Sequence, residues 1–229
     1  MRRAEGAREL MDGPLSEADL TASLADLDRL NRWFGGYALT LARIRRVAAT
    51  TPRSREMIVV DVGGGRGDFA VRLVRWARRA GRRVRVIVVD RDAGGVARAP
   101  RPGYPEIVVV AGDATALPLR EGAADVVAFS LTLHHLEPDE AATALAEMAA
   151  VGQYGVIVND LRRGYLSLAL VWLATRILRM HPVSRHDGPL SVRRSYSAAE
   201  MRALAEKAGL RQIDITTYPM LARVVAVLS

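Results

Sequence analysis

The chain has 229 residues, of which 50% are hydrophobic and 25% are charged, and it contains no cysteine. This length corresponds to one large domain, or to one domain with an appendage, and the apolar fraction excludes wholesale disorder. The lack of cysteine excludes a disulfide scaffold, a cysteine-ligated zinc or iron–sulfur centre and a cysteine nucleophile, and it is compatible with a reducing compartment.

Arginine carries the positive charge of the chain. There are 33 basic and 25 acidic residues, which give a net charge of +8, and Lys207 is the only lysine. A nucleic-acid partner, an anionic membrane and a solvated arginine surface would each fit this balance, and the solvated surface is the simplest interpretation. The N-terminus lacks the apolar core of a signal peptide, and the longest apolar stretch, Tyr165–Leu178, contains Arg176 and is too short to span a membrane. We therefore expect a soluble, cytoplasmic protein.

The first fifty residues predict a tail and two helices. We expect residues 1–14 to form a loose tail. Ser16, with Asp19 three residues later, is a typical helix N-cap, and leucines follow at helical spacing. The pair Gly35-Gly36 ends this helix, and a second helix is expected over Leu39–Ala48.

Strands then alternate with helices. Continuous apolar runs predict five buried strands, at Met57–Val62, Val84–Val89, Ile107–Ala111, Asp125–Ser130 and Gly155–Asn159. Helices are expected over Asp68–Ala80 and Pro138–Ala150. Such alternation predicts crossover connections and a parallel sheet with both faces covered.

The last third begins with an apolar helical stretch, Leu161–Met180, and ends with two strands. Between them, His181–Arg194 contains two prolines and a glycine and is expected to be a loop, and Ser197 is expected to cap a helix that ends at Ala208. The closing strands, 213–217 and 221–228, are separated by a tight connection, which predicts an antiparallel pair at the edge of the sheet.

A glycine-rich turn follows the first predicted strand, in the sequence VVDVGGGRGD. Glycines at Gly63, Gly65 and Gly67 let backbone N–H groups approach a ligand, and the start of the next helix favours a negative group. Their spacing differs from the G-x-G-x-x-G of dinucleotide-binding turns, and the Gly-Lys-Ser/Thr of a P-loop is absent. A simple tight turn remains open, but Asp61 beside the turn suits a ligand that carries an ammonium group.

Two further acids follow the next two strands. Asp90 closes the second strand, where a carboxylate can accept both hydroxyls of a ribose, and Asp113 follows the third, where it can accept an adenine amino group. The carboxyl ends of parallel strands share one edge of the sheet, and ligands bind at that edge. Each acid alone is an ordinary loop residue, but three of them beside a glycine turn predict a nucleoside site.

These segments, VVDVGGGRGDF, VVD, GDATALPL and DVVAFSLTLHHLEPDE, resemble the successive motifs of class I S-adenosylmethionine-dependent methyltransferases. The resemblance covers about residues 55–160. It implies an α/β, Rossmann-like fold with a seven-stranded, mostly parallel sheet and an antiparallel edge pair. It also implies S-adenosylmethionine as cofactor, S-adenosylhomocysteine as product, and a cofactor site formed by Asp61, Gly63, Gly64, Gly65, Asp90, Arg91, Asp113, Ala114 and Ser130.

His134 and His135 are the candidates for a catalytic base. Both follow the fourth strand at the binding edge, and a histidine that titrates near neutrality can take a proton from a phenol. A structural role at the sheet edge remains open for either. The fourth strand ends in AFSL rather than in the Asn/Asp-Pro-Pro-aromatic pattern typical of base-amino methyltransferases, and only 5% of residues are aromatic, so a nucleic-acid substrate is disfavoured. No side-chain set suggests a metal.

The flanking segments predict how an acceptor is enclosed. We divide the chain into an N-terminal tail and helical cap over 1–52 and a methyltransferase core over 53–229, with 161–195 as a lid or substrate insertion. The apolar helix within 161–180 would be a lid, a core helix or a peripheral membrane contact. The segments LNRWFGGY and SRHDGPLSVRRSYS resemble small methyltransferases associated with bacterial type III polyketide synthases. That resemblance implies Trp33, Tyr37, Arg185 and His186 at the substrate.

We therefore expect methyl transfer to a small hydrophobic acceptor, by O-methylation of a phenolic or polyketide-derived hydroxyl of secondary metabolism. C-methylation of a quinone-like ring, RNA methylation or binding through the arginines, and a non-catalytic cofactor-binding role remain alternatives. The sequence leaves the oligomeric state open.

Overall fold

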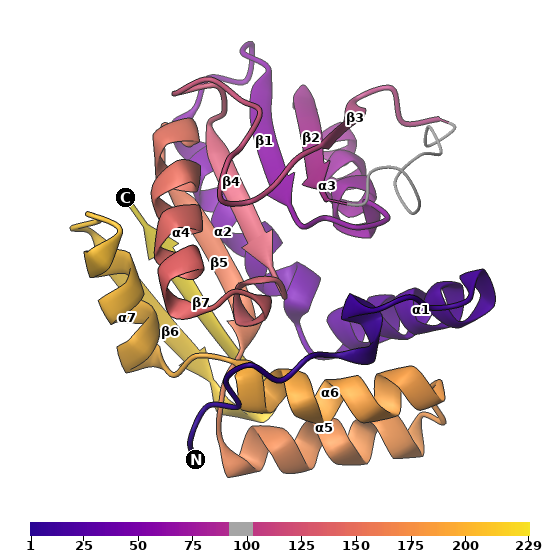
Figure 1. The fold of residues 1–229 in the computed structure, drawn as a ribbon. Helices are drawn as coiled ribbons and strands as arrows, with labels where there is room; N and C mark the ends of the chain where they lie inside the picture. The colour runs from indigo at the N-terminus through magenta and orange to yellow at the C-terminus, as the bar shows by residue number, and fades with distance from the viewer. Residues whose placement is uncertain (92–102) are drawn as a thin grey trace.

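The computed structural model describes residues 1–91 and 103–229. They form a seven-stranded sheet with helices on both faces (Figure 1). The strands are β1 (Met57–Val62), β2 (Val84–Asp90), β3 (Ile107–Ala111), β4 (Val126–Ser130), β5 (Val156–Leu161), β6 (Ile213–Tyr218) and β7 (Arg223–Leu228). Their order across the sheet is β3-β2-β1-β4-β5-β7-β6. The first five are parallel, whereas β7 is antiparallel to both β5 and β6, so the predicted fold class is confirmed.

The strand order creates a crevice beside β1. The chain moves outward from β1 to β2 and β3, then returns to place β4 on the other side of β1. The segments that leave β1 and β4 therefore diverge at the carboxyl ends of these strands. Ligands of open α/β sheets bind at such a switch point. Here it lies between Gly63, which follows β1, and Leu131, which follows β4.

Two helical layers bury the sheet. On one face, α2 (Gly36–Thr50) and α3 (Asp68–Arg79) place Ile44 and Leu73 in a core with the strand valines. On the other face, α4 (Pro138–Val151) and α7 (Ala198–Lys207) do the same with Leu145 and Met201. All four of these side chains are fully buried. The continuous apolar strands predicted this arrangement, because a parallel sheet covered on both faces has no polar side.

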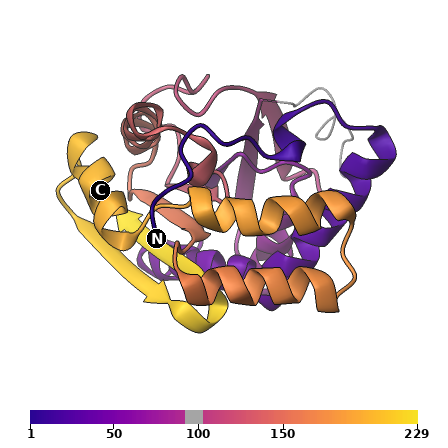
Figure 2. The same ribbon diagram turned by 60° about the horizontal axis from the view of Figure 1, so that its bottom comes forward.

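A third group of helices lies across the carboxyl ends of the strands. It consists of η1 (Leu10–Asp12), α1 (Glu17–Trp33), η2 (Leu133–His135), α5 (Tyr165–Ile177) and α6 (Pro182–Arg194), while η3 (Pro219–Leu221) connects β6 to β7. Figure 2 shows α5 and α6 side by side in front of the sheet. Helix α5 is shorter than the predicted stretch by a few residues at each end. These elements enclose the side of the molecule on which the crevice opens.

The predicted loop over 181–194 is wrong, because this segment is helix α6. Pro182 occupies the first turn, where its missing N–H costs nothing, and the His181 side chain accepts a hydrogen bond from the backbone N–H of Val183. Gly188 faces α5, where an added Cβ would lie 3.1 Å from Val171 and 3.2 Å from Thr175. Tertiary packing against α5 thus overrides the local preference of proline and glycine to end a helix.

The predicted loose tail is also wrong, because residues 3–12 are held by distant parts of the chain. The Arg3 guanidinium donates to Glu137 at 2.6 Å and to the carbonyl groups of Leu136 and Arg194. The backbone N–H groups of Leu10 and Met11 both donate to the buried Asp187 carboxylate of α6, at 2.8 and 3.0 Å. Sequence patterns describe local structure, and these partners lie more than 130 residues away.

Candidate functional site

The glycine turn after β1 has the backbone geometry that only glycine adopts easily. Gly63, Gly65 and Gly67 have φ angles of +64°, +50° and +70°. A Cβ on Gly63 would clash with Thr132, and one on Gly64 would lie 2.7 Å from the Asp61 carboxylate. A Cβ on Gly65 would meet nothing within 4 Å. The turn is therefore packed against the sheet on one side and open at Gly65.

Asp61 lies beneath this turn without a counter-charge. Its side chain is 2% exposed, and its Oδ2 atom has no hydrogen-bond partner among the described residues. Burial, with a smaller contribution from the nearby Asp90 carboxylate, raises the pKa of Asp61 to about 7. A buried carboxylate that lacks a donor is a binding group for a cation, such as the ammonium of a bound ligand.

Asp90 and Asp113 occupy different positions at the same edge. Asp90 ends β2 and accepts a hydrogen bond from the Gly65 backbone N–H at 2.8 Å, so it fixes the glycine turn while it lines the cleft. Asp113 uses Oδ1 to accept from the backbone N–H and hydroxyl of Thr115, and Oδ2 to accept from Arg91 at 2.7 Å. These contacts outweigh burial and hold its pKa at about 2, the Thr115 N–H making the largest contribution. Both Asp113 oxygens therefore have hydrogen-bond partners within the chain, and the predicted contact of Asp113 with adenine stays a prediction.

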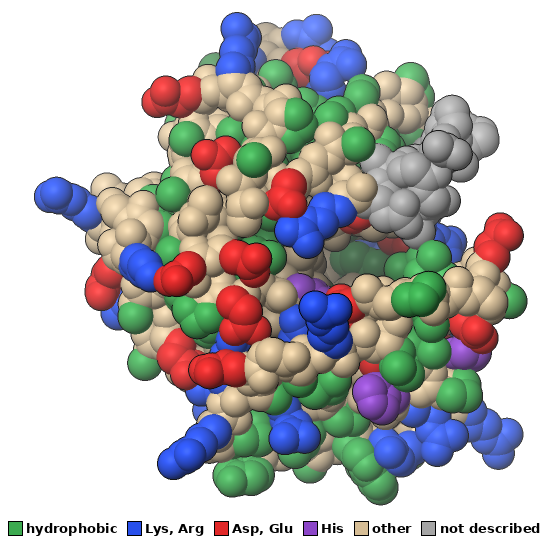
Figure 3. Space-filling model, viewed as in Figure 1, with side chains coloured by type: hydrophobic (Ala, Val, Ile, Leu, Met, Phe, Trp, Pro, Cys, Tyr) green, Lys and Arg blue, Asp and Glu red, His purple; other side chains and the backbone are tan. Residues whose placement is uncertain are grey.

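Three adjoining cavities open at the switch point. The largest, about 340 Å³, lies between the glycine turn and α1 and is lined by Gly63, Gly65, Asp90, Arg91 and Ala114. A second, about 130 Å³, lies over Asp61, Gly64 and Ser130. The third, about 110 Å³, is mainly apolar and is formed by η1, α1, α5, α6 and the loop before β7. Figure 3 shows the surface hollowed where the first of them opens.

Leu131 is the residue that joins the three cavities, because its side chain lines all of them. Its φ angle is +53°, which is unfavourable for a branched residue and costs on the order of 1–3 kcal/mol. Ser130, just before it, lies 3.3 Å from the Thr40 hydroxyl. Backbone strain of this kind persists where the surrounding structure holds a side chain in one position. Here the Leu131 side chain is held where the three cavities meet.

His134 and His135 face the apolar cavity, each held by a carboxylate. His134 is 3% exposed, and its Nδ1 lies 2.7 Å from Asp160. His135 lines both the apolar cavity and the large cleft, and its Nδ1 lies 3.0 Å from Asp12. Burial opposes ionisation of Asp160, but His134 and two backbone N–H groups bring its pKa below the ordinary value. Both imidazoles therefore turn Nε2 inward.

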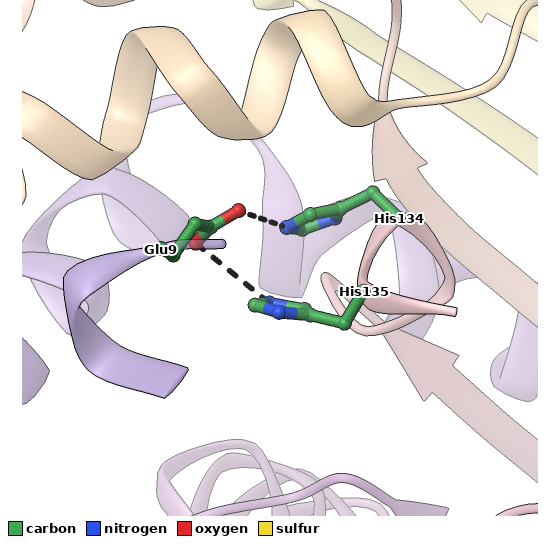
Figure 4. Close-up of side chains that lie close together, drawn as sticks. All are labelled: Glu9, His134 and His135. Carbon is green, nitrogen blue, oxygen red and sulfur yellow. Dashed lines mark ion pairs between the residues drawn. The ribbon is translucent and has the colours of Figure 1, made fainter. Parts of the chain in front are cut away.

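Glu9 also lines this cavity, and Figure 4 shows its carboxylate beside the two imidazole rings. Its carboxylate is 7% exposed and lies 3.5 Å from His134 Nε2 and 3.9 Å from His135 Nε2. Burial raises the pKa of Glu9 to about 7, although His135 and Arg194 partly oppose this rise. Sequence reasoning missed Glu9, Asp12 and Asp160, and the polar Asn159-Asp160 pair within the otherwise apolar β5 was the one available signal.

The residues predicted at the substrate are not gathered at one place. Tyr37 lines the 130 Å³ cavity and donates to Asp28 at 2.9 Å. Trp33 is 63% exposed, and Arg185 and His186 are exposed on α6; none of the three lines a cavity described above. His186 instead contacts Asp187, at 2.8 Å. A role for these three at a substrate stays a prediction.

The cleft has features that fit the cofactor expected from the resemblance. The large cavity offers room beside Gly65, Asp90 presents a carboxylate at its side, and Asp61, with its unpartnered oxygen, lines the adjoining 130 Å³ cavity. Ala114 and Val89 add apolar walls at the far end. The donor set therefore suits S-adenosylmethionine, which carries a ribose, an adenine and a zwitterionic methionine.

Comparisons with known proteins agree with this assignment. Residues 59–155 match the protein family described as a methyltransferase domain. Over 121 residues, the chain is 31% identical to the ubiquinone/menaquinone biosynthesis C-methyltransferase of Caulobacter vibrioides. That alignment covers 50% of this chain and 48% of the relative, so the chain matches about half the length of the curated protein.

Solved structures share the fold. A SAM-dependent methyltransferase from Aquifex aeolicus superposes with a TM-score of 0.55 at 20% identity, over 75% of this chain and 81% of that one. Magnesium protoporphyrin IX methyltransferase from Synechocystis, solved with bound S-adenosylhomocysteine, has a TM-score of 0.56 at 15% identity, over 95% and 89%. The domain match relates residues 59–155 to methyltransferases, and the solved structures show that the chain has the fold of such enzymes. No helix in the part of the chain that the structure describes is long and apolar enough to cross a membrane.

Proposed function

We propose that this chain transfers the methyl group of S-adenosylmethionine to a hydroxyl of a small hydrophobic acceptor, such as a phenol. The observation that carries the proposal is the sharing of Leu131, Met11 and His135 between the cofactor cleft and an apolar cavity. A methyl group that leaves the cleft at this junction would enter the apolar cavity directly. Its volume of about 110 Å³ is comparable to the cavities that hold a single benzene ring.

The chain's own residues would supply alignment and proton handling. Methyl transfer is an in-line displacement at a sulfonium carbon, so correct placement of the two reactants provides much of the rate. Leu27 and Leu30 of α1, Phe34 directly after it and Val171 of α5 would hold the ring and exclude water. The wall formed by Glu9, His134 and His135 would hold the acceptor hydroxyl and remove its proton.

The apolar character of this wall's surroundings favours a small organic acceptor over RNA. Apolar side chains, mainly those of leucine, make up most of the cavity lining, and the arginines that give the chain its charge lie mostly on the outer surface. The outer face of α5 exposes apolar side chains such as Tyr165 and Ile177, while its inner face packs on α6. A peripheral membrane contact through that face, and a polyketide origin of the acceptor, stay predictions.

C-methylation of a quinol-like ring is the second candidate. The 31% identity to a C-methyltransferase of quinone biosynthesis favours it, although that likeness covers half of each protein. Removal of a phenolic proton would also activate a ring carbon, so the same histidine wall serves both reactions. The two differ only in which atom of the acceptor faces the cofactor.

A labelled-methyl screen over phenols, quinols and RNA tests the proposal. We expect transfer to one or more phenols, with product fragmentation that shows a methoxy group rather than a ring methyl. His134→Gln should lower turnover at least 100-fold with little change in cofactor affinity, because general-base groups contribute about 10²–10⁴-fold. His181→Gln is the matched control, since His181 lines none of the three cavities and has no predicted role at the substrate. Transfer to RNA alone, or equal activity of both variants, would contradict the proposal.

A further inference from the structure

Three metal-ligating groups converge in the wall of the apolar cavity. Glu9 comes from the N-terminal segment, and His134 and His135 come from η2. The ligand atoms of these three side chains all lie within 4.8 Å of one another. Figure 4 shows the two imidazole rings approaching the Glu9 carboxylate from the same side.

The partners of both imidazoles determine which nitrogen faces Glu9 with a lone pair. His134 Nδ1 lies 2.7 Å from Asp160, and His135 Nδ1 lies 3.0 Å from Asp12. A carboxylate accepts a hydrogen bond, so in each neutral ring the hydrogen is on Nδ1 and Nε2 is left as an acceptor. Metal-binding histidines are held in this way, with the second nitrogen bonded to a carboxylate.

The distances within the cluster fit a shared cation better than hydrogen bonds. The Nε2–oxygen separations of 3.5 and 3.9 Å exceed the 2.7–3.2 Å range of N–H···O hydrogen bonds. Glu9 Oε1 is buried without a hydrogen-bond partner among the described residues. Two ligands bound to one tetrahedral ion at 2.0–2.1 Å are about 3.4 Å apart. The 3.5 Å between His134 Nε2 and Glu9 Oε1 matches this spacing, and the 3.9 Å of His135 Nε2 is measured to the other oxygen, Oε2.

The side chains around the cluster carry more negative than positive charge when their carboxyl groups are ionised. Four carboxylates line the cavity or contact its histidines, from Glu9, Asp12, Asp160 and Asp187. Two guanidinium groups oppose them. Arg194 lies 2.8 Å from Asp12 and 3.7 Å from Glu9 Oε1, and the buried Arg223 lines the cavity. A divalent cation would balance the excess negative charge while both histidines stay neutral.

We propose that Glu9, His134 and His135 form a binding site for a divalent transition-metal ion such as Zn²⁺, with its open coordination positions directed into the apolar cavity. Two imidazoles and one carboxylate suit zinc and its neighbours in the first transition row rather than magnesium or calcium. Asp160 and Asp12 are positioning residues, because they act through the ligand rings. The use of the ion in catalysis rests on the proposed function, whereas its binding does not.

With the ion bound, His134 and His135 would be ligands instead of bases, and the ion would bind the acceptor oxygen and favour loss of its proton to water. The oxygen lone pair then forms the bond to the methyl carbon, and the sulfur keeps the electron pair of the broken carbon–sulfur bond. The cation is neither oxidised nor reduced. Such a site would select acceptors that present an oxygen toward η2.

Titration of the chelator-treated full chain with Zn²⁺ and Co²⁺ tests the site. We expect one ion per chain with a dissociation constant in the micromolar range or below, and visible Co²⁺ absorption typical of a nitrogen and oxygen ligand set. Glu9→Gln and His135→Ala should each weaken binding at least tenfold, and Asp160→Asn should weaken it about 10–100-fold. His181→Ala and His186→Ala, the other two histidines, should bind as the unmodified chain does.

The proposal is overturned if the unmodified chain binds neither ion stoichiometrically, or if Glu9→Gln and His135→Ala bind with unchanged affinity. Unfolding midpoints of each variant show whether the fold is kept, and the titration of the unmodified chain decides the question even if a variant fails to fold. Methyl transfer that persists in chelator would overturn only the catalytic use of the ion. Normal metal binding without transfer to any acceptor would instead count against the proposed function.

Discussion

At the scale of single residues, the proposed ligand-binding group Asp61 lowers the stability of the ligand-free protein when it is ionised. Its carboxyl group is buried, and its Oδ2 has no donor within the described chain. The pKa rises from 3.8 to about 7, so the folded chain resists ionisation of Asp61 more than the unfolded chain does. The stability that the protonated form contributes is therefore present at low pH and lost as the pH rises through 7.

Compared with the unmodified chain, Asp61→Asn should consequently have a higher free energy of unfolding at pH 8, without ligand, and little or no gain at pH 4. One pKa unit corresponds to about 1.4 kcal/mol, so the gain is at most on the order of 4 kcal/mol. The same change should weaken S-adenosylmethionine binding, because a neutral amide cannot pair with an ammonium group. Chemical unfolding at both pH values and calorimetric titration measure the two effects.

Asp125→Asn is the matched control for that experiment. Asp125 is also buried, but it accepts a hydrogen bond from the Ile58 backbone N–H at 2.7 Å and pairs with Arg55. Its replacement should destabilise the protein at pH 8 and leave cofactor affinity nearly unchanged. Equal loss of stability in both variants would show that Asp61 is an ordinary structural acid.

At the scale of elements, a comparison of Gly65 with Gly81 distinguishes the effect of backbone strain from the effect of contact with the cofactor. Gly65 and Gly81 both have positive φ angles, and a Cβ at either would meet no atom within 4 Å. Only Gly65 lines the cleft. An alanine at either position should cost on the order of 1 kcal/mol of stability, because L residues disfavour this conformation.

Gly65→Ala should therefore lower cofactor affinity at least tenfold, while Gly81→Ala should bind the cofactor as the unmodified chain does. Calorimetric titration with S-adenosylhomocysteine compares the two. If both variants bind equally well, the cofactor does not approach the chain at Gly65, and the assignment of the turn fails.

The same scale shows what sequence could predict. The apolar runs of β1 and β3 marked these strands to the residue. β1 is almost fully buried, as predicted, whereas the predicted burial of β3 is wrong, because β3 lies at the edge of the sheet and all its residues are half-buried or exposed. Helix α6 was not predicted, because Gly188 and Pro189 disfavour a helix locally. Packing against α5 offsets this unfavourable local preference. The glycine turn and Asp90 were predictable from local spacing. Glu9 was not, because it reaches the histidines through a contact between segments about 125 residues apart.

At the scale of the whole molecule, the N-terminal segment contacts both η2 and α6 beside the apolar cavity. Residues 9–12 lie against η2 and α6, and the Asp187 carboxylate accepts two of their backbone N–H groups. Both oxygens are needed, and an amide offers only one acceptor. Loss of one such contact to a charged group costs about 1.5–3 kcal/mol.

Asp187→Asn should accordingly loosen this segment, with its main effect on the apolar cavity. We expect faster hydrogen exchange in residues 4–12 and a several-fold rise in KM for the acceptor, with a smaller loss of S-adenosylhomocysteine affinity because Met11 and Asp12 also line the cleft. Asp139→Asn, which removes an exposed pair with Lys207, is the control. An unchanged KM for the acceptor, or a loss of cofactor affinity larger than the rise in KM, would contradict this role of the segment.

The most direct measurement is a crystal structure of the chain with S-adenosylhomocysteine. The ribose should lie within hydrogen-bond distance of Asp90 and the amino group beside Asp61. The sulfur should lie next to Leu131, at the opening into the apolar cavity. Absence of the molecule from the cleft at saturating concentration, or a pose that turns the sulfur away from that cavity, would contradict the account.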